Sequence, residues 1–396
     1  MTGLYKKAVG SSETGGPEKA RIFTACHGTQ LLVIQHLRRH LERQPAREYL
    51  VWYPMDGSQR LDVFMSSIIA GAGFSGVLDM RHFKSLRSRG SSSARWWFEA
   101  AWRTRSDAKC FRGWMRANRI RENESELWSD DPLHFNVVFA KALLRRARQV
   151  KIPHAFNLED GTCCSYRDGL LKKTAASLAK RLLFWPWIRL ASSCDFRSET
   201  VFRYDSGYSF DRPSCWANAA IDASGLISAR AFMETLETLP IELRTQVHSS
   251  AAQLRTCPRP VVLVLLFGLT AELAAAYRES LSRIFAERAL SLRECTVAVK
   301  VHPGSSGSEE AGFIAWAKAN LPAEVVPIYT LVNLELMLAD MAPDFILAGP
   351  CGALPVAQRL GLGAPIVLPE IMAELCRAFP GDAACFNEMV VGMESW

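Results

Sequence analysis

The sequence lacks any apolar run of the ~20 residues that a transmembrane helix needs. Its longest apolar run, Pro260 to Leu269, has the length of a core strand. The first twenty residues are polar, with Gly and Ser, and have no apolar segment typical of a secretory signal. We therefore expect a disordered N-terminus over 1–20 and a cytoplasmic protein.

Metal-binding patterns are also missing. The eleven cysteines are scattered, with no CxxC or Cys/His zinc spacing, and the adjacent Cys163 and Cys164 cannot easily bridge each other. This use of cysteine is typical of reduced thiols in a cytosolic protein. There is no DxD motif either. We expect no bound metal and no cofactor.

Nucleic-acid signatures are absent as well, although positive charge is concentrated in one place. Between Arg81 and Arg121 there are twelve cations and only two acids, Glu99 and Asp107, with Trp and Phe interleaved. One interpretation is a solvated helical arm whose aromatic residues pack on a sheet. The other is a site for a carboxylated or phosphorylated chain. No helix-turn-helix, finger or RNP signature supports nucleic acid as the partner, so none is expected. The candidate residues for binding such a chain are Arg95, Arg103, Arg105, Arg112 and Arg116.

A second basic stretch, Tyr166 to Leu190, combines cations with the aromatic run Phe184-Trp185-Pro186-Trp187. Such a segment either packs against its own domain or lies in an anionic membrane interface. Peripheral contact with the inner face of a membrane therefore stays open.

The composition is that of a soluble globular chain long enough for two domains: 396 residues, 49% apolar and 22% charged. Strands alternate with helices from Arg21 onward and again from Pro260 to Leu368, a pattern that predicts parallel sheets with crossover helices. The expected domain layout is an N-terminal α/β domain at 21–245, a linker at 246–259, a second α/β domain at 260–380 and a final segment at 381–396. A helix is expected over His134 to Val150.

The stretch V-A-V-K-V-H-P, Val297 to Pro303, reads as a buried strand with His302 just beyond its end. Open α/β sheets bind ligands at the carboxyl ends of their strands. Pro303 fixes φ and removes a backbone donor, so we expect a stiff corner there. His302 is either a catalytic imidazole or a structural one.

A second candidate is Asn157-Leu158-Glu159-Asp160-Gly161, which looks like a strand end turning into a loop. Taken alone, Glu-Asp-Gly is a common surface turn. Its adjacent carboxylates can instead act as a base, since a neighbouring like charge tends to raise a carboxyl pKa.

Together, the acidic D/E-D/E-G motif and the later K-x-H-P motif resemble those of bacterial sialyltransferases, most closely the capsule polysialyltransferase group. The resemblance implies a GT-B-like α/β fold, with two Rossmann-like domains facing a cleft and residues 381–396 returning to the first domain. It also implies an inverting, metal-independent transfer from CMP-sialic acid to an acidic glycan. In that reaction Glu159 or Asp160 would act as the base, and His302 would lie beside the leaving phosphate. His27 and Gly28 either line the cleft or form an ordinary strand-to-helix connection.

On the donor side, the resemblance points to Lys300, Pro303 and the turn Gly349-Pro350-Cys351-Gly352. Related sialyltransferases often carry paired Ser or Thr hydroxyls at that turn, whereas this sequence has Cys351 and Gly352. Backbone amides at the helix start, or Ser305 and Ser306, can take their place. A plain strand-to-helix turn is the other interpretation of this segment.

Two alternatives stay open. A transferase using CMP-Kdo would need the same groups, and a non-catalytic polyanion-binding protein would use His302 only as a structural corner.

Overall fold

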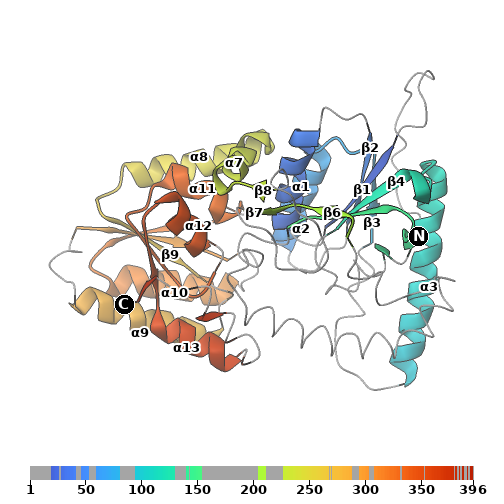
Figure 1. Ribbon diagram of the computed structural model, residues 1–396. Helices are drawn as coiled ribbons and strands as arrows, with labels where there is room; N and C mark the ends of the chain where they lie inside the picture. Colours follow the sequence, from blue (N-terminus) through green and yellow to red (C-terminus); the bar gives the residue numbers. More distant parts are fainter. Residues whose placement is uncertain are drawn as a thin grey trace. The chain divides into compact units, whose positions relative to one another are not determined.

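The structure is a computed structural model. It describes residues 19–25, 28–41, 46–52, 59–80, 94–129, 140–141, 143–153, 204–210, 226–266, 268, 270–287, 294–302, 307–330, 332–351, 353–378, 380, 383, 386–387, 390 and 393–395 (Figure 1). The described residues form two units. Unit 1 takes those within Met1–Gly57, Ile69–His154 and Leu170–Leu226, and unit 2 those within Ser58–Ile68 and Ile227–Trp396.

Unit 1 is built on a parallel six-stranded sheet in the order β3-β2-β1-β4-β5-β6. Its strands are β1 (Ala20–Ala25), β2 (Arg47–Trp52), β3 (Gly76–Asp79), β4 (Ser125–Ser129), β5 (Arg148–Lys151) and β6 (Ser206–Gly207). The helices are α1 (Gly28–Leu41), α3 (Ala94–Ala117) and the short η2 (Glu122–Glu124). Helix α2 (Gln59–Gly71) is divided between the units: its residues up to Ile68 belong to unit 2 and the rest to unit 1. Buried residues such as Ile22, Phe23, Leu50 and Val51 fill both faces of the central strands, as a sheet covered on both sides requires.

Helix α3 is amphipathic over Ser106 to Ala117, where its side chains are described. Ala108, Phe111 and Trp114 are buried in the core formed with β1 and β2, and the ring of Tyr49 meets that of Trp114 edge-on, with centroids 5.5 Å apart. Lys109 and Arg116 are exposed, and Arg112 is partly exposed. Phe111 and Trp114 therefore pack on the sheet, as the first interpretation of this segment predicts, and the cations occupy the outer face.

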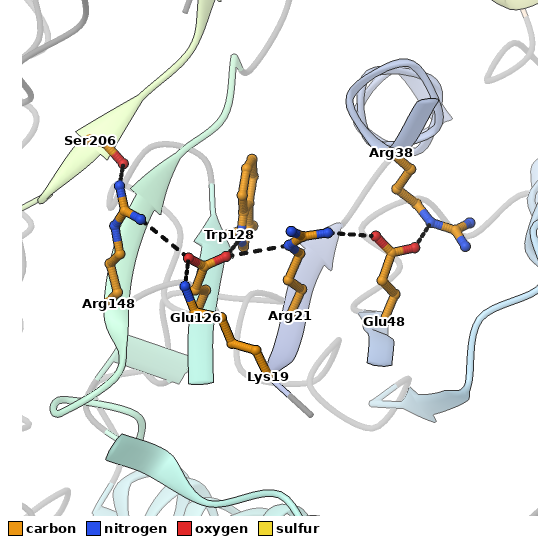
Figure 2. A network of polar contacts seen from close by, with 8 residues as sticks. All are labelled: Lys19, Arg21, Arg38, Glu48, Glu126, Trp128, Arg148 and Ser206. Atoms are coloured by element: carbon orange, nitrogen blue, oxygen red, sulfur yellow. Dashed lines mark hydrogen bonds and ion pairs between the residues drawn. The ribbon is translucent and has the colours of Figure 1, made fainter. Parts of the chain in front are cut away.

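Charged side chains cross the edge of the unit 1 sheet where its strands begin. Figure 2 shows this amino-edge network, whose members are Lys19, Arg21, Arg38, Glu48, Glu126, Trp128, Arg148 and Ser206. Glu126 on β4 meets the cations of Lys19 at 2.6 Å, Arg148 at 3.3 Å and Arg21 at 3.4 Å. Arg21 also lies 3.5 Å from Glu48, which pairs in turn with Arg38 at 2.6 Å. Because members come from β1, β2, β4, β5 and β6, the network joins the starts of five strands.

Unit 2 repeats the same strand order in a second parallel sheet, β11-β10-β9-β12-β13-β14. Its strands are β9 (Val261–Leu265), β10 (Thr296–Lys300), β11 (Glu324–Ile328), β12 (Phe345–Ala348), β13 (Ala364–Val367) and β14 (Glu394–Ser395). A two-stranded ladder, β7 (Ser209–Phe210) with β8 (Leu226–Ile227), lies at the chain boundary between the units.

Helices cover both faces of the unit 2 sheet, with α8, α11 and α12 on one face and α9, α10 and α13 on the other (Figure 1). Their bounds are α8 (Ile241–Arg255), α9 (Ala271–Glu287), α10 (Gly307–Asn320), α11 (Leu334–Met341), α12 (Ala353–Leu360) and α13 (Pro369–Ala378), preceded by α7 (Ala229–Met233) and η4 (Glu234–Thr238). Both units therefore have the Rossmann-like order 3-2-1-4-5-6. The predicted α/β fold class with two Rossmann-like domains is confirmed.

The prediction of a linker at 246–259 is wrong. Most of it belongs to α8, whose Leu243, Val247, Ala251 and Leu254 are buried and which packs on α11. The four residues recur at helical spacing on one face, so burying them ties this segment to unit 2. The chain passes into unit 2 earlier, at Ile227.

Two other expectations also differ from the structure. Residues 148–150, predicted to end a helix, belong to the strand β5 between β4 and β6. In the final segment, predicted to return to the first domain, Glu394 and Ser395 instead pair with Ile366 and Val367 of β13. The backbone groups of β13 on that side need partners, and β14 supplies them within unit 2.

Residues 1–18 and 166–190 lie outside the described part of the chain, and with them the expected disordered N-terminus and the possible membrane segment. Among the residues that are described, no helix is long and apolar enough to cross a bilayer.

Candidate functional site

The strands of unit 2 end level with one another. The register places Ile328, Lys300, Leu265, Ala348 and Val367 in one row across β11, β10, β9, β12 and β13. Connections leave the sheet in opposite directions from β9 and β12, which is the topological switch point where sheets of this kind bind ligands. We therefore take this carboxyl edge as the candidate site.

His302 lies at this edge, two residues beyond the end of β10, and is exposed. The N–H of Val301 donates to the carbonyl of Ile328 at 3.2 Å, so the ladder between β10 and β11 continues up to the residue before His302. The predicted position of His302 at a strand end is confirmed. Pro303, Ser305 and Ser306 lie outside the described residues, and their donor-binding roles stay predictions.

Lys300, the last residue of β10, points inward instead of toward solvent. Its side chain is buried, with Nζ donating to the carbonyl of Thr330 at 2.5 Å and to that of Val301 at 3.3 Å. Burial lowers the pKa of Lys300 to about 8, against the opposing charges of Glu335 and Glu310. This arrangement does not favour the direct contact with a donor that the sequence motif predicts for Lys300.

Two carboxyl groups that sequence reasoning missed lie near Lys300. Glu335 is in the first turn of α11, and Glu310, which is buried, is in the first turn of α10. Burial raises the pKa of Glu335, while a backbone hydrogen bond and the charge of Lys300 act the other way. Glutamate is common in the first turn of a helix because the helix dipole stabilises negative charge there. The sequence therefore offers no signal that separates these two glutamates from others at helix starts.

The turn after β12 carries Gly349, Pro350 and Cys351. A Cβ on Gly349 would lie 2.6 Å from Cγ2 of Ile371, so α13 packs where only glycine fits. Burial raises the pKa of Cys351 to about 12, although hydrogen bonds from the Ala353 and Leu354 backbone lower it. The thiol therefore stays protonated, and its sulfur accepts hydrogen bonds from backbone amides at the start of α12.

These findings bear on the predicted phosphate site at Gly349, Cys351 and Gly352. Gly349 has a packing reason to be glycine, and Cys351 already occupies amides at the helix start. Gly352 is outside the described residues. The three donor-binding roles stay predictions.

In unit 1, Gly28 is the first residue of α1, whereas His27, Glu159 and Asp160 lie outside the described residues. Arg95, Arg103 and Arg105 are in α3, but their side chains are not described; Arg112 and Arg116 lie on its outer face. The structure thus brings Lys300 and His302 to one edge of unit 2 and Arg112 and Arg116 to one helix of unit 1. In the described residues no group of three or more His, Cys, Asp or Glu is placed to hold a metal ion.

No protein-family model and no curated protein matches the sequence. Solved structures do. A putative UDP-N-acetylglucosamine 2-epimerase from Listeria monocytogenes matches 96% of this chain and 92% of its own, at 9% identity and a TM-score of 0.50. The UDP-GlcNAc 2-epimerase from Methanocaldococcus jannaschii matches 88% and 83% at 11% identity, with a TM-score of 0.49. A UDP-glucosyltransferase from Polygonum tinctorium matches 93% and 84% at 12% identity, with a TM-score of 0.46.

The likeness to the Listeria protein extends over both units and shows the fold alone. It agrees with the predicted two-domain α/β architecture.

Proposed function

We propose that the chain is a glycosyltransferase using a nucleotide-activated sugar, and specifically that it moves sialic acid from CMP-sialic acid to an acidic glycan. The observation that carries the proposal is the exposed imidazole of His302 at the carboxyl edge of a 3-2-1-4-5-6 parallel sheet. The motif resemblance to sialyltransferases supplies the donor.

The chemistry needs positive charge or a proton where the phosphate of CMP departs. An imidazole with an ordinary pKa near 6.5 can supply either around neutral pH. Strands β10 and β12 are separated by β9, which sets them about 10 Å apart at ~4.8 Å per strand. A phosphate and its sugar can span that distance, from His302 to the turn at Gly349 and Cys351.

The acceptor hydroxyl must lose a proton as it attacks the anomeric carbon. We assign that proton to Glu159 or Asp160, on the motif resemblance. A single displacement inverts the anomeric centre, and it requires neither a metal ion nor a cofactor.

The acceptor side rests on charge. Lys109, Arg112 and Arg116 recur at three- and four-residue spacing, so their side chains share one face of α3. Arg105 falls on the same face by its spacing from Lys109 and Arg112, and Arg95 and Arg103 stay predicted acceptor contacts. Such a basic face suits a polymer that carries one carboxylate per sugar, such as capsular polysialic acid. We place this reaction in the cytoplasm, with peripheral contact between the basic segment at 166–190 and an anionic inner membrane face.

A second candidate uses a UDP-sugar. It is favoured by the fold shared with the Listeria protein, whose name gives UDP-N-acetylglucosamine as its substrate. CMP-Kdo is the other donor to include, because it carries the same leaving group as CMP-sialic acid.

The test is a donor panel of CMP-sialic acid, CMP-Kdo and UDP-N-acetylglucosamine, each with and without sialylated acceptors. Transfer only from CMP-sialic acid supports the proposal; conversion of UDP-N-acetylglucosamine without an acceptor identifies an epimerase. Protection from thermal unfolding gives an independent readout, because a ligand at ~100 times its Kd adds about 2.7 kcal/mol to the free energy of unfolding. If CMP, CTP and UDP all fail to protect, the chain is not a nucleotide-sugar enzyme and a polyanion-binding role takes its place.

His302 is tested directly. His302→Ala should lower kcat about 10²–10⁴-fold, the range of a lost acid-base group. The matched control is His248→Ala, because His248 is an exposed residue of α8 whose Nδ1 lies 2.9 Å from Asp340. Near-wild-type turnover by His302→Ala would refute the assignment.

A further inference from the structure

The buried ammonium of Lys300 has a role that its sequence motif does not suggest. Nζ donates to two carbonyls that lie just past different strand ends: that of Val301 after β10 and that of Thr330 after β11. The backbone ladder between these strands has its last bond from Val301 N–H to Ile328. The Lys300 side chain thus adds a cross-link two residues further along β11.

The backbone around Lys300 is also held from the other side. The carbonyl of Lys300 accepts the N–H of Leu266, at the end of β9, at 3.1 Å. Beyond the end of β11, the hydroxyl of Thr330 accepts the N–H of Val332 at 3.2 Å, close to the start of α11. Three strand ends therefore meet at Lys300, two of them through its ammonium and the third through its backbone carbonyl.

Burying that group is unfavourable unless it is compensated. The compensation comes from the two carbonyls and from Glu310 and Glu335, which face Lys300 from the first turns of α10 and α11. Even so, burial leaves the pKa of Lys300 lowered, so the folded chain disfavours the charge that it retains. An apolar residue of similar volume would suit a purely structural position at least as well.

The carbonyl of Val301 comes directly before His302 in the chain, and the carbonyl of Thr330 comes directly after Tyr329, beyond the end of β11. We therefore propose that Lys300 is a positioning residue. It cross-links the ends of β10 and β11 and so holds His302 in place without touching the ligand. This inference rests on the proposed catalytic role of His302. The K-x-H spacing has a geometric reason: Lys300 is two residues before His302, and its ammonium reaches the carbonyl of the residue between them.

The experiment compares Lys300→Met, Lys300→Gln and Lys300→Arg in the full chain. Methionine removes the cross-link, glutamine keeps one donor without charge, and arginine keeps charge and donors. Lys318→Met is the matched control, since Lys318 is an exposed residue near the end of α10. We expect kcat with CMP-sialic acid to fall about 10–100-fold in Lys300→Met, the scale of a misplaced catalytic group. The donor KM should change less than about threefold, because a residue that does not touch the donor does not contribute to its ground-state binding. Arginine should restore part of the kcat.

A second readout does not depend on turnover. Amide hydrogen exchange at Val301 and the ¹⁵N resonances of the His302 imidazole, assigned with His302→Ala, should change in Lys300→Met and not in Lys318→Met. This readout still decides the inference if the wild-type chain transfers no sugar from CMP-sialic acid, in which case only the proposed function fails.

Three results would overturn the inference. The first is a raised donor KM with an unchanged kcat, which would place Lys300 in direct contact with the ligand. The second is unaltered exchange and resonances in Lys300→Met and Lys300→Gln. The third is loss of folding in all three Lys300 variants, which would make the role one of stability.

Discussion

Glu126 should make a large contribution to the stability of unit 1, and Glu126→Gln is the change that measures it. The carboxylate is 4% exposed and meets Lys19, Arg148, Arg21 and the indole N–H of Trp128 (Figure 2). Glutamine has the same shape and can keep one acceptor, but it removes the charge on which three cations converge.

The magnitude follows from how buried each partner is. Lys19 and Arg148 are 48% and 52% exposed, so losing their ion pairs should matter little. Arg21 is 2% exposed and would lose one of the two carboxylates that it meets in the amino-edge network, keeping Glu48 at 3.5 Å. Removing one partner of a buried pair typically costs 3–5 kcal/mol, and we expect about 3 because glutamine retains an oxygen. For a unit of this size that is a fall of about 6–12 °C in Tm.

The assay is urea and thermal unfolding, with hydrogen exchange of peptides covering β1 and β4 to attribute the transition to unit 1. Glu124→Gln is the matched control: Glu124 lies two residues away and pairs with the exposed Arg121 at 3.1 Å, a contact worth about 0–1 kcal/mol.

The pH dependence has a definite sign. Burial alone would raise the pKa of Glu126, but the bonds and charges of its partners, Lys19 foremost, lower it overall. The carboxylate therefore stabilises the fold fully above about pH 4.5, its unfolded value, and progressively less as the pH falls through the folded pKa. The difference between wild type and Glu126→Gln should narrow below that pH. A difference under about 1 kcal/mol at pH 7, equal to that of the control, would refute the argument.

The remaining predictions concern other parts of the chain. Gly349→Ala should destabilise unit 2 by about 1–3 kcal/mol, since its Cβ overlaps α13, whereas Gly312→Ala, with open space around it in α10, should be neutral or stabilising by up to about 1 kcal/mol; equal melting temperatures would contradict this. Reversing Arg112 and Arg116 together should raise the acceptor KM, with the effect shrinking at high salt, and should leave the donor KM unchanged; an acceptor KM insensitive to both changes would leave α3 as a solvated arm. The lowered pKa of Lys300 means that the unfolded chain binds one more proton than the folded chain between about pH 8 and 10.5. The free energy of unfolding of wild type relative to Lys300→Met should therefore rise with pH across that range. A difference between the two proteins that does not change with pH would contradict the burial of the charge.

The alternation of strands and helices from Val261 to Val367 could be predicted from the sequence. Runs such as Val261 to Leu265 and Thr296 to Lys300 are short, apolar and separated by helical stretches, which is the pattern of buried parallel strands. The position of His302 followed from the strand alone.

The missed features have physical causes. Strand β4, with the sequence S-E-L-W-S, is buried although it is polar, because Glu126 finds its partners only after the fold brings other strands beside it. The same holds for Lys300: a motif shows its spacing to His302 but not the direction of its side chain. In α8, the prolines at 240 and 258 favoured a linker, whereas the helical spacing of Leu243, Val247 and Leu254 was the stronger signal.

The amino-edge network has a consequence for how unit 1 moves. Its ion pairs and hydrogen bonds join the beginnings of β1, β2, β4, β5 and β6 (Figure 2). Each of these five strands is therefore held at its beginning by side chains as well as by the backbone ladder. Breathing motions that separate neighbouring strands should therefore be smallest at this end of the sheet.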